Sequence, residues 1–302
     1  MTAARTGWTR RRVLTLGLAS AGAVAAGVVG AERGILPGKT VLDTLDGACS
    51  VPGPAVTFAP FGPSSSGTFY SAARHRTVGY TIAYPPRHRA GDELPLVVML
   101  HGYGGNHTDA LSGMSPAQAV AVRVDGGPLA PMALVTVDGG PGYWNPHPGD
   151  NPMAMVVGEL IPRCRHLGLG RRRIGMMGIS MGGYGALLLA EKYPHLIDAV
   201  AAISPAIWTS YAQAHTANPG AYASQAAFTA SDAVTHAAAL ARIPVRVAAG
   251  YDDPFYPGVQ ALTRALPAGA VVDLARGCHT DPFFAEQQPP SLAFLARHLT
   301  RS

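Results

Sequence analysis

Short, mainly apolar runs recur along most of the chain, and segments with apolar residues at helical spacing lie between them. These runs occupy residues 94–100, 132–137, 173–177, 200–203, 245–249 and 271–274. Continuous runs of this length are typical of strands that are buried on both faces of a sheet. Strands that alternate with helices predict an α/β fold, in which a mostly parallel central sheet carries helices on both faces.

Two more strands and four helices complete the predicted fold. Residues 68–71 and 77–84 have the pattern of two strands joined by a polar turn. Helical spacing predicts helices over 153–166, 180–193, 257–266 and 291–300. Pro162 should kink or shorten the first of these helices, because a proline inside a helix has no N–H to donate. No insertion is long enough to form a large lid domain.

The chain divides into three parts. Its 302 residues are enough for one large domain with a sizeable core, and we place this α/β domain at residues 67–302. Residues 32–66 precede it, and the part from Ser50 to Ser66 is rich in Pro, Gly and Ser, which predicts a linker or an irregular coat. Residues 1–31 have the features of a targeting segment.

The N-terminus predicts export. Arg10, Arg11 and Arg12 stand directly before an apolar segment over 13–31, which is the layout of a bacterial twin-arginine signal. The segment is long enough for a membrane anchor, which takes ~20 residues. Cleavage after Ala31 is nevertheless favoured, because the segment is mostly Ala and Gly. We therefore expect the twin-arginine translocase as a partner and an extracellular, periplasmic or envelope-associated location.

The net charge of +5 does not indicate a nucleic-acid partner. Four of the 23 basic residues lie in residues 1–31, which hold no acidic residue, so 19 basic residues remain against 18 acidic ones. No metal or cofactor is expected, since Cys49, Cys164 and Cys278 match no zinc pattern and no nucleotide-binding glycine fingerprint is present. Small buried thiols with one bridge at most are the expected arrangement of the three cysteines.

The most informative stretch is 178–182, which reads Gly-Ile-Ser-Met-Gly. It has the form G-x-S-x-G and lies between the strand expected over 173–177 and the helix expected over 180–193. A serine on such a sharp strand-to-helix turn has its hydroxyl exposed above the sheet, and the glycines permit the turn because they have no Cβ. The motif and its context predict that Ser180 is a nucleophile.

A serine nucleophile needs a base to take its proton and a carboxylate to orient that base. Asp252 and Asp253 follow the expected strand 245–249, and His279 follows the expected strand 271–274. The carboxyl ends of parallel strands are where ligands bind in open sheets. We expect His279 to be the base, because it follows the last strand and comes after the acid. Spacing alone leaves the choice between Asp252 and Asp253 open.

The oxyanion of an acyl-transfer intermediate needs backbone donors. The N–H of Met181, directly after the serine, is the first candidate. The loop over 101–105, His-Gly-Tyr-Gly-Gly, follows the strand 94–100, and its glycines allow the backbone to approach a substrate. Tyr103 is the preferred second donor and Gly104 the next. His101 is expected to brace the loop.

Two tryptophans are candidates for the wall of an acyl or alcohol pocket. They are Trp144 and Trp208, and the sequence equally allows both to be packing residues. The Ala-rich segment 208–242 is expected to hold one or two short helices that wall the site.

These motifs together resemble the esterase branch of the α/β-hydrolases, which includes S-formylglutathione hydrolase (esterase D), feruloyl esterases and mycobacterial mycolyltransferases. The resemblance covers about residues 67–300 and rests on residues 101–105, 178–183, 250–253 and 277–279. Members often carry a glycine, two residues and then the acid, which points to Asp253. They often follow the histidine with Asp-Trp, whereas this chain has Thr280-Asp281-Pro282-Phe283-Phe284. The composition and the leader resemble those of a secreted actinobacterial protein.

The resemblance implies an exported serine carboxylesterase that acts on a small-molecule or lipid ester through Ser180, Asp253 and His279 and an acyl-enzyme intermediate. The first alternative is a mycolyltransferase-like acyltransferase, in which an alcohol replaces water. The second is a non-catalytic cell-wall-binding protein on the same fold. A peptidase is a weaker alternative.

Overall fold

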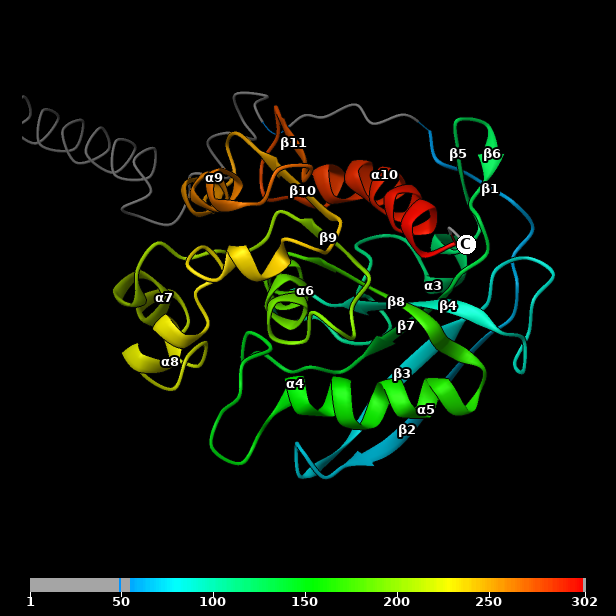
Figure 1. Ribbon diagram of the computed structural model, residues 1–302, viewed down its shortest axis with the longest axis horizontal. Coiled ribbons are helices and arrows are strands. Elements are labelled where there is room, and N and C mark those ends of the chain that lie inside the picture. The colour runs from blue at the N-terminus through cyan, green and yellow to red at the C-terminus, as the bar shows by residue number, and fades with distance from the viewer. Residues whose placement is uncertain (1–48, 50–54, 301–302) are drawn as a thin grey trace, which may run out of the picture.

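A computed structural model describes Cys49 and residues 55–300, and an eight-stranded sheet lies at its centre (Figure 1). The strands lie in the order β11-β10-β9-β8-β4-β7-β3-β2. Their bounds are β2 (Ser64–Ser71), β3 (Arg76–Ala83), β4 (Leu94–Leu100), β7 (Ala133–Val137), β8 (Leu169–Ile179), β9 (Ala199–Ile203), β10 (Val245–Gly250) and β11 (Val271–Ala275). The six strands from β11 to β7 in this order pair in parallel. β3 pairs antiparallel with β7, and β2 pairs antiparallel with β3. The sheet is therefore mostly parallel, as predicted.

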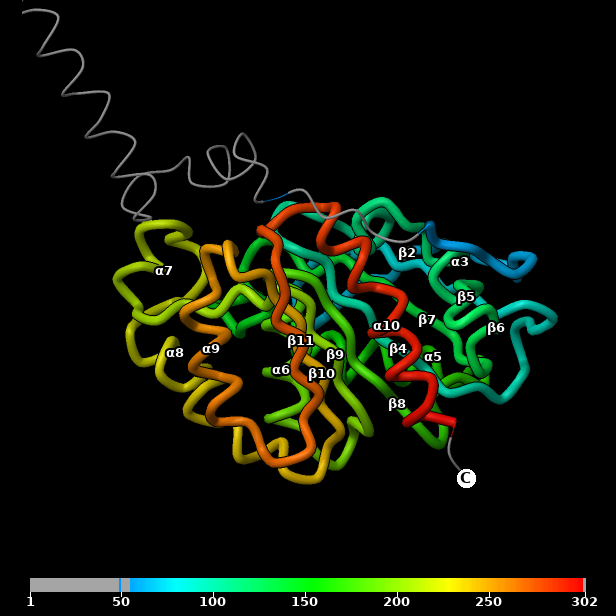
Figure 2. Tube along the Cα trace, turned by 90° about the horizontal axis from the view of Figure 1, so that it is seen from above, coloured from blue at the N-terminus to red at the C-terminus, as the bar shows by residue number. Residues whose placement is uncertain are grey.

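Helices cover both faces of the sheet, and each face has its own apolar core (Figures 1 and 2). One core includes side chains of α4 (Pro152–Met155), α5 (Ile161–His166), α6 (Met181–Lys192) and α9 (Tyr256–Ala265). The other includes side chains of α3 (Pro116–Ala119) and the C-terminal helix α10 (Asp281–Leu299). Strands between two such cores need apolar residues at nearly every position, which explains the continuous runs in the sequence.

The helical stretch expected over 153–166 is present at its full length, with a change of helix type directly before Pro162. A π-helical turn, Val156–Leu160, separates α4 from α5, and Pro162 lies in the first turn of α5. The wider turn lets Ile161 donate to the carbonyl of Val156 directly before the proline, which has no N–H of its own.

Helix α10 begins ten residues earlier than predicted. The sequence interpretation placed its start at Ser291, where the amphipathic pattern begins. Pro289 and Pro290, which usually end or kink a helix, both lie inside α10. The first half of α10 buries Phe283, Phe284, Gln287 and Gln288. We infer that this burial outweighs the backbone hydrogen bonds that the two prolines remove.

The stretch from Ser50 to Ser66, predicted to be a linker or an irregular coat, contains two short pieces of strand in its described part. Strand β1 (Thr57–Phe58) forms a small sheet with β5 (Val122–Val124) and β6 (Gly127–Pro128), and β2 begins at Ser64, before the expected boundary at residue 67. Ser64–Ser66 pair with Ala83–Thr81 of β3. A mostly exposed edge strand needs few apolar residues, so its composition is that of a loop.

The segment 208–242 forms short helices, as expected. They are α7 (Tyr211–Ala217), α8 (Gln225–Ala230) and a 3₁₀ turn, Ala237–Leu240. Figures 1 and 2 show α7 and α8 together on one side of the molecule, near α9. The described residues form no separate lid domain.

The expected export signal, residues 1–31, lies outside the described residues. Within Cys49 and residues 55–300, no helix is both long enough and apolar enough to cross a membrane. In the same part of the chain, no three His, Cys, Asp or Glu side chains are grouped so that they could hold a metal ion.

Candidate active site

Ser180 occupies a strained turn between β8 and α6. Its backbone has φ 57° and ψ −122°, a conformation that costs free energy for a residue with a Cβ. The surrounding backbone holds it there. The Ser180 N–H donates to the carbonyl of Ile203 at 2.9 Å, and the Ser180 carbonyl accepts from Ala206 at 3.0 Å. The end of β9 and the loop after it thus fix the turn that presents the Ser180 hydroxyl.

Both glycines of the G-x-S-x-G motif are required by close packing. A Cβ on Gly178 would overlap the carbonyl of Gly182, and a Cβ on Gly182 would overlap the carbonyl of Leu100 at the end of β4. The first turn of α6 can therefore lie against β8 and β4 only if these positions have no side chain.

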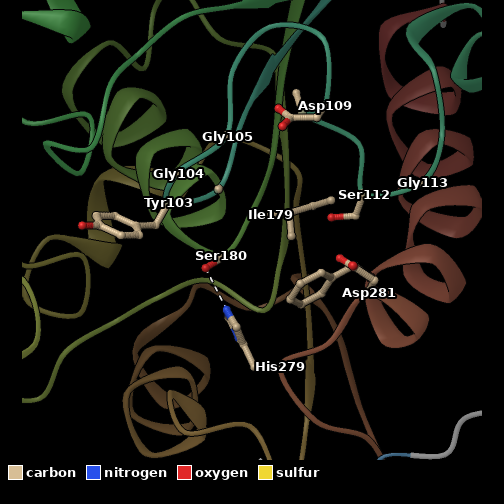
Figure 3. Close-up of a pocket in the computed structure, with 13 residues that line it drawn as sticks. Tyr103, Gly104, Gly105, Asp109, Ser112, Gly113, Ile179, Ser180, His279 and Asp281 are labelled. Atoms are coloured by element: carbon tan, nitrogen blue, oxygen red, sulfur yellow. Dashed lines mark hydrogen bonds between the residues drawn. The ribbon is translucent and has the colours of Figure 1, made fainter.

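Ser180, His279 and Asp253 form a continuous hydrogen-bonded chain. His279 Nε2 lies 2.8 Å from Ser180 Oγ (Figure 3), and His279 Nδ1 lies 2.8 Å from Asp253 Oδ2. The Asp253 side chain is completely buried, and its other oxygen accepts from the N–H of Phe255 at 2.8 Å. The structure thus brings Asp253, and not Asp252, to the histidine.

The hydrogen-bond partners indicate which ring nitrogen of His279 carries a proton. The Asp253 carboxylate is an acceptor, so Nδ1 donates to it. In the neutral ring Nε2 is then an acceptor, and the Ser180 hydroxyl can donate to it. This arrangement can draw the proton from Ser180 Oγ.

Two phenylalanines that the sequence interpretation missed flank the imidazole of His279. The centroid of Phe255 lies 5.1 Å from that of the imidazole, and the centroid of Phe284 lies 5.0 Å from it. Phe284 belongs to the segment, residues 280–284, that departs from the Asp-Trp pattern expected from the resemblance. That departure was the one available signal.

The candidate oxyanion donors lie around Ser180. Met181 is the first residue of α6, where backbone N–H groups have no partner within the helix. The loop after β4 makes a tight turn, closed by Gly105 N–H to the Gly102 carbonyl at 3.1 Å, with Gly104 at φ 78°. Tyr103 and Gly104 line the same cavity as Ser180.

His101 braces this loop, as predicted. It is buried, and its Nε2 accepts from the N–H of Gly139 at 2.9 Å while Nδ1 donates to the carbonyl of Gly102 at 2.7 Å. Burial lowers the pKa of His101, which favours the neutral ring that can accept and donate in this way. His101 therefore joins the loops that follow β4 and β7.

Trp144 is a packing residue, so the assignment to a substrate pocket is corrected. Its side chain is completely buried and fills the space left by Gly139 and Gly185, and Nε1 donates to the carbonyl of His101 at 3.3 Å. Trp208 packs edge-on against Phe255, with centroids 4.7 Å apart. Neither tryptophan lines the cavity at Ser180.

A cavity of about 550 Å³ opens beside the serine and the histidine (Figure 3). It lies between the loop after β4 and the start of α10. Segment 208–242, which was expected to wall the site, supplies none of its lining residues. The sequence interpretation missed the 109–113 part of its wall. The lining residues are Gly102, Tyr103, Gly104, Gly105, Asp109, Ala110, Ser112, Gly113, Ile179, Ser180, His279, Asp281 and Phe284.

Comparisons with known proteins give a family match for the central part of the chain. The family model described as "Putative esterase" matches residues 158–267, which include Ser180 and Asp253. No curated protein sequence matches the chain.

Three solved structures show what the fold of this chain is similar to. A ferulic acid esterase is 17% identical with a TM-score of 0.64 (78% of this chain and 98% of that chain). The S-formylglutathione hydrolase of Agrobacterium tumefaciens is 19% identical with a TM-score of 0.63 (81% and 98%). MPT51 (FbpC1) of Mycobacterium tuberculosis is 16% identical with a TM-score of 0.60 (79% and 99%). The chain thus has the α/β-hydrolase fold of these proteins, and its central part matches the esterase family of that fold.

Proposed function

We propose that the chain is a serine hydrolase that cleaves carboxylic ester bonds. The observation that carries the proposal is the chain of two 2.8 Å contacts from Ser180 through His279 to the buried Asp253, next to an open cavity. The match of residues 158–267 to an esterase family supports the same reaction class.

In the first half-reaction, Ser180 Oγ attacks the ester carbonyl while its proton passes to His279 Nε2. The Asp253 carboxylate holds the ring and stabilises the imidazolium that forms. The amides of Met181 and of Tyr103 or Gly104 stabilise the tetrahedral oxyanion. Loss of one such donor costs on the order of a hundredfold in rate. The imidazolium then protonates the leaving alcohol, and the acyl group remains on Ser180.

In the second half-reaction, water enters the cavity and gives a proton to His279 Nε2 as it attacks the acyl-enzyme. The acid leaves, and the proton returns to Ser180 Oγ. Since Asp109, Ser112 and Asp281 interrupt the apolar surface that Ala110, Ile179 and Phe284 give the cavity wall, we expect esters with short acyl groups to be the better substrates.

We also propose that the protein works outside the cytoplasm. The twin-arginine pattern at Arg10 to Arg12 supports this proposal. The disulfide between Cys49 and Cys278 supports it further, because such bonds persist mainly in oxidising compartments.

The test is hydrolysis of p-nitrophenyl esters from acetate to palmitate by the full chain, beside Ser180→Ala. We expect turnover that the substitution abolishes, together with labelling of Ser180 by a fluorophosphonate probe. A folded wild type that neither hydrolyses these esters nor reacts with the probe would contradict the proposal. The non-catalytic binding protein would then be the better reading.

A further inference from the structure

A disulfide connects the N-terminal segment to the residue directly before His279. Cys49 and Cys278 are 229 residues apart in sequence, with Cα atoms 5.0 Å apart. Cys278 is completely buried, and Cys49 is 6% exposed. The backbone that carries His279 therefore has a covalent attachment outside the sheet.

The position of β11 shows why such an attachment matters. β11 is the last strand of the eight-stranded sheet and, among the described strands, pairs only with β10. After β11 the chain runs beside the loop that carries Asp253, the acid of the candidate triad. Tyr251 N–H donates to the carbonyl of Ala275 at 2.8 Å, and Asp252 N–H donates to the carbonyl of Gly277 at 3.0 Å. These backbone contacts support the segment from the β10 side.

The segment then turns into α10 through a glycine with a positive φ and a helix start without a side-chain cap. Gly277 has φ 152°, a conformation that residues with a Cβ rarely adopt. The N-cap of α10, Thr280, makes no side-chain capping hydrogen bond, and its Oγ1 is buried without a partner. His279 thus stands between an edge strand and a weakly capped helix start.

We propose that the Cys49–Cys278 disulfide is a positioning element for His279 in the reaction proposed above. It fixes the backbone at residue 278 and so keeps Nε2 within 2.8 Å of Ser180 Oγ and Nδ1 within 2.8 Å of Asp253. A displacement of about 1 Å in such a chain of groups can lower the rate a hundredfold. Because both sulfurs are buried, reductants reach the bond slowly. The bond therefore acts as a permanent positioning element and not as a rapid redox switch.

The test compares the full-length wild type with Cys49→Ala, which removes the bond and leaves Cys278 as a small buried thiol. Cys164→Ala is the matched control, since Cys164 is buried and unbridged, and burial raises the pKa of its thiol to about 12. The readouts are kcat and KM for p-nitrophenyl acetate, and amide hydrogen exchange over residues 276–280. We expect kcat of Cys49→Ala to fall on the order of ten- to hundredfold with little change in KM, while the control keeps its kcat.

The outcomes separate the inference from the proposed function. If Cys49→Ala melts at a lower temperature but keeps its kcat and its exchange over 276–280, the bond is only a stabilising cross-link and the inference is overturned. If the intact wild type hydrolyses no ester and binds no fluorophosphonate, the proposed function fails. Hydrogen exchange then decides the inference. Faster exchange over 276–280 in Cys49→Ala than in the control supports it, and equal exchange overturns it.

Discussion

The imidazole of His279 is held by groups from separate parts of the chain: Asp253, Ser180, and the rings of Phe255 and Phe284. Motif order was enough to predict Ser180 and His279, because each follows a strand with a distinct pattern. It could not separate Asp252 from Asp253, because both follow β10 directly and the direction of each side chain depends on the turn. The positions of the Phe255 and Phe284 rings depend on packing between loops, which no sequence motif indicates.

The choice of acid gives a test at the residue scale. Asp253→Asn should lower kcat by on the order of a thousandfold or more, because an amide no longer favours the Nδ1-protonated ring. Asp252→Asn is the matched control and should change kcat little. The measurement is kcat for p-nitrophenyl acetate at neutral pH. An equal loss in both variants would show that the loop as a whole, and not the Asp253 carboxylate, is required.

Glu191, at the end of α6, predicts how stability depends on pH. It is 7% exposed, and neither carboxylate oxygen has a hydrogen-bond partner. Burial, and then the nearby charge of Asp232, raises its pKa from 4.5 to about 8. Since the folded-state pKa is above the unfolded value, the proton favours folding. The contribution is complete below about pH 4.5 and is lost as the pH rises through about 8.

The substitution Glu191→Gln should remove this dependence, because an amide resembles the protonated acid. Urea unfolding at pH 5 and at pH 8.5 should show the wild type losing roughly 2–4 kcal/mol more than the variant. Glu93→Gln, at an exposed side chain, is the control. If the wild type and Glu191→Gln lose the same free energy, Glu191 is not protonated in the folded protein at neutral pH.

At the scale of elements, prediction worked best where an element is buried on two sides. The run over 94–100 coincides with β4, because burial on both faces demands apolar residues at each position. Prediction failed for elements whose sequence has no clear strand or helix pattern and whose structure depends on their place in the fold. β1, β5 and β6 are only two or three residues long. The first half of α10 precedes Pro289 and Pro290, two residues that usually end a helix. The burial of these elements comes from partners distant in sequence.

The close contact between α6 and β4 can be tested by a substitution that adds one methyl group. Gly182→Ala should lower the free energy of unfolding by about 1–3 kcal/mol or prevent folding, because its Cβ would overlap the Leu100 carbonyl. Gly158→Ala is the matched control. It lies in a helical turn with open space around it, so alanine should be neutral or stabilising by up to about 1 kcal/mol. Thermal melting of both variants decides the matter, and equal melting temperatures would contradict the predicted close approach.

At the scale of the molecule, the reacting groups lie together at the carboxyl ends of β8, β10 and β11, while the cavity wall comes from the loop after β4 and the start of α10. The α/β fold class and the mostly parallel sheet could be predicted from the sequence, whereas the order of the strands comes from the structure. The shape of the cavity could not be predicted, because segment 109–113 has no motif and reaches the site only through the packing of a long loop.

The charge of this cavity predicts substrate selectivity. Asp109 and Asp281 line it, none of its lining residues is Lys or Arg, and neither carboxylate forms an ion pair with a described residue. An ester with a free carboxylate, mono-p-nitrophenyl succinate, should react several-fold more slowly than the neutral butyrate at low ionic strength. Asp281→Asn, or 0.5 M salt, should bring the kcat/KM values of the two esters closer together. Equal kcat/KM for the two esters in low salt would contradict this prediction.

The packing of the tryptophans has an optical consequence. Trp144 is sealed in the core, so it contributes a constant, short-wavelength fluorescence. Trp208 is partly exposed and rests on Phe255, which touches the imidazole of His279. The third tryptophan, Trp8, lies in the expected export signal. In the processed protein, we expect a change in emission after an inhibitor acylates Ser180 to come mainly from Trp208, which would make this residue an internal fluorescent reporter of the surroundings of His279.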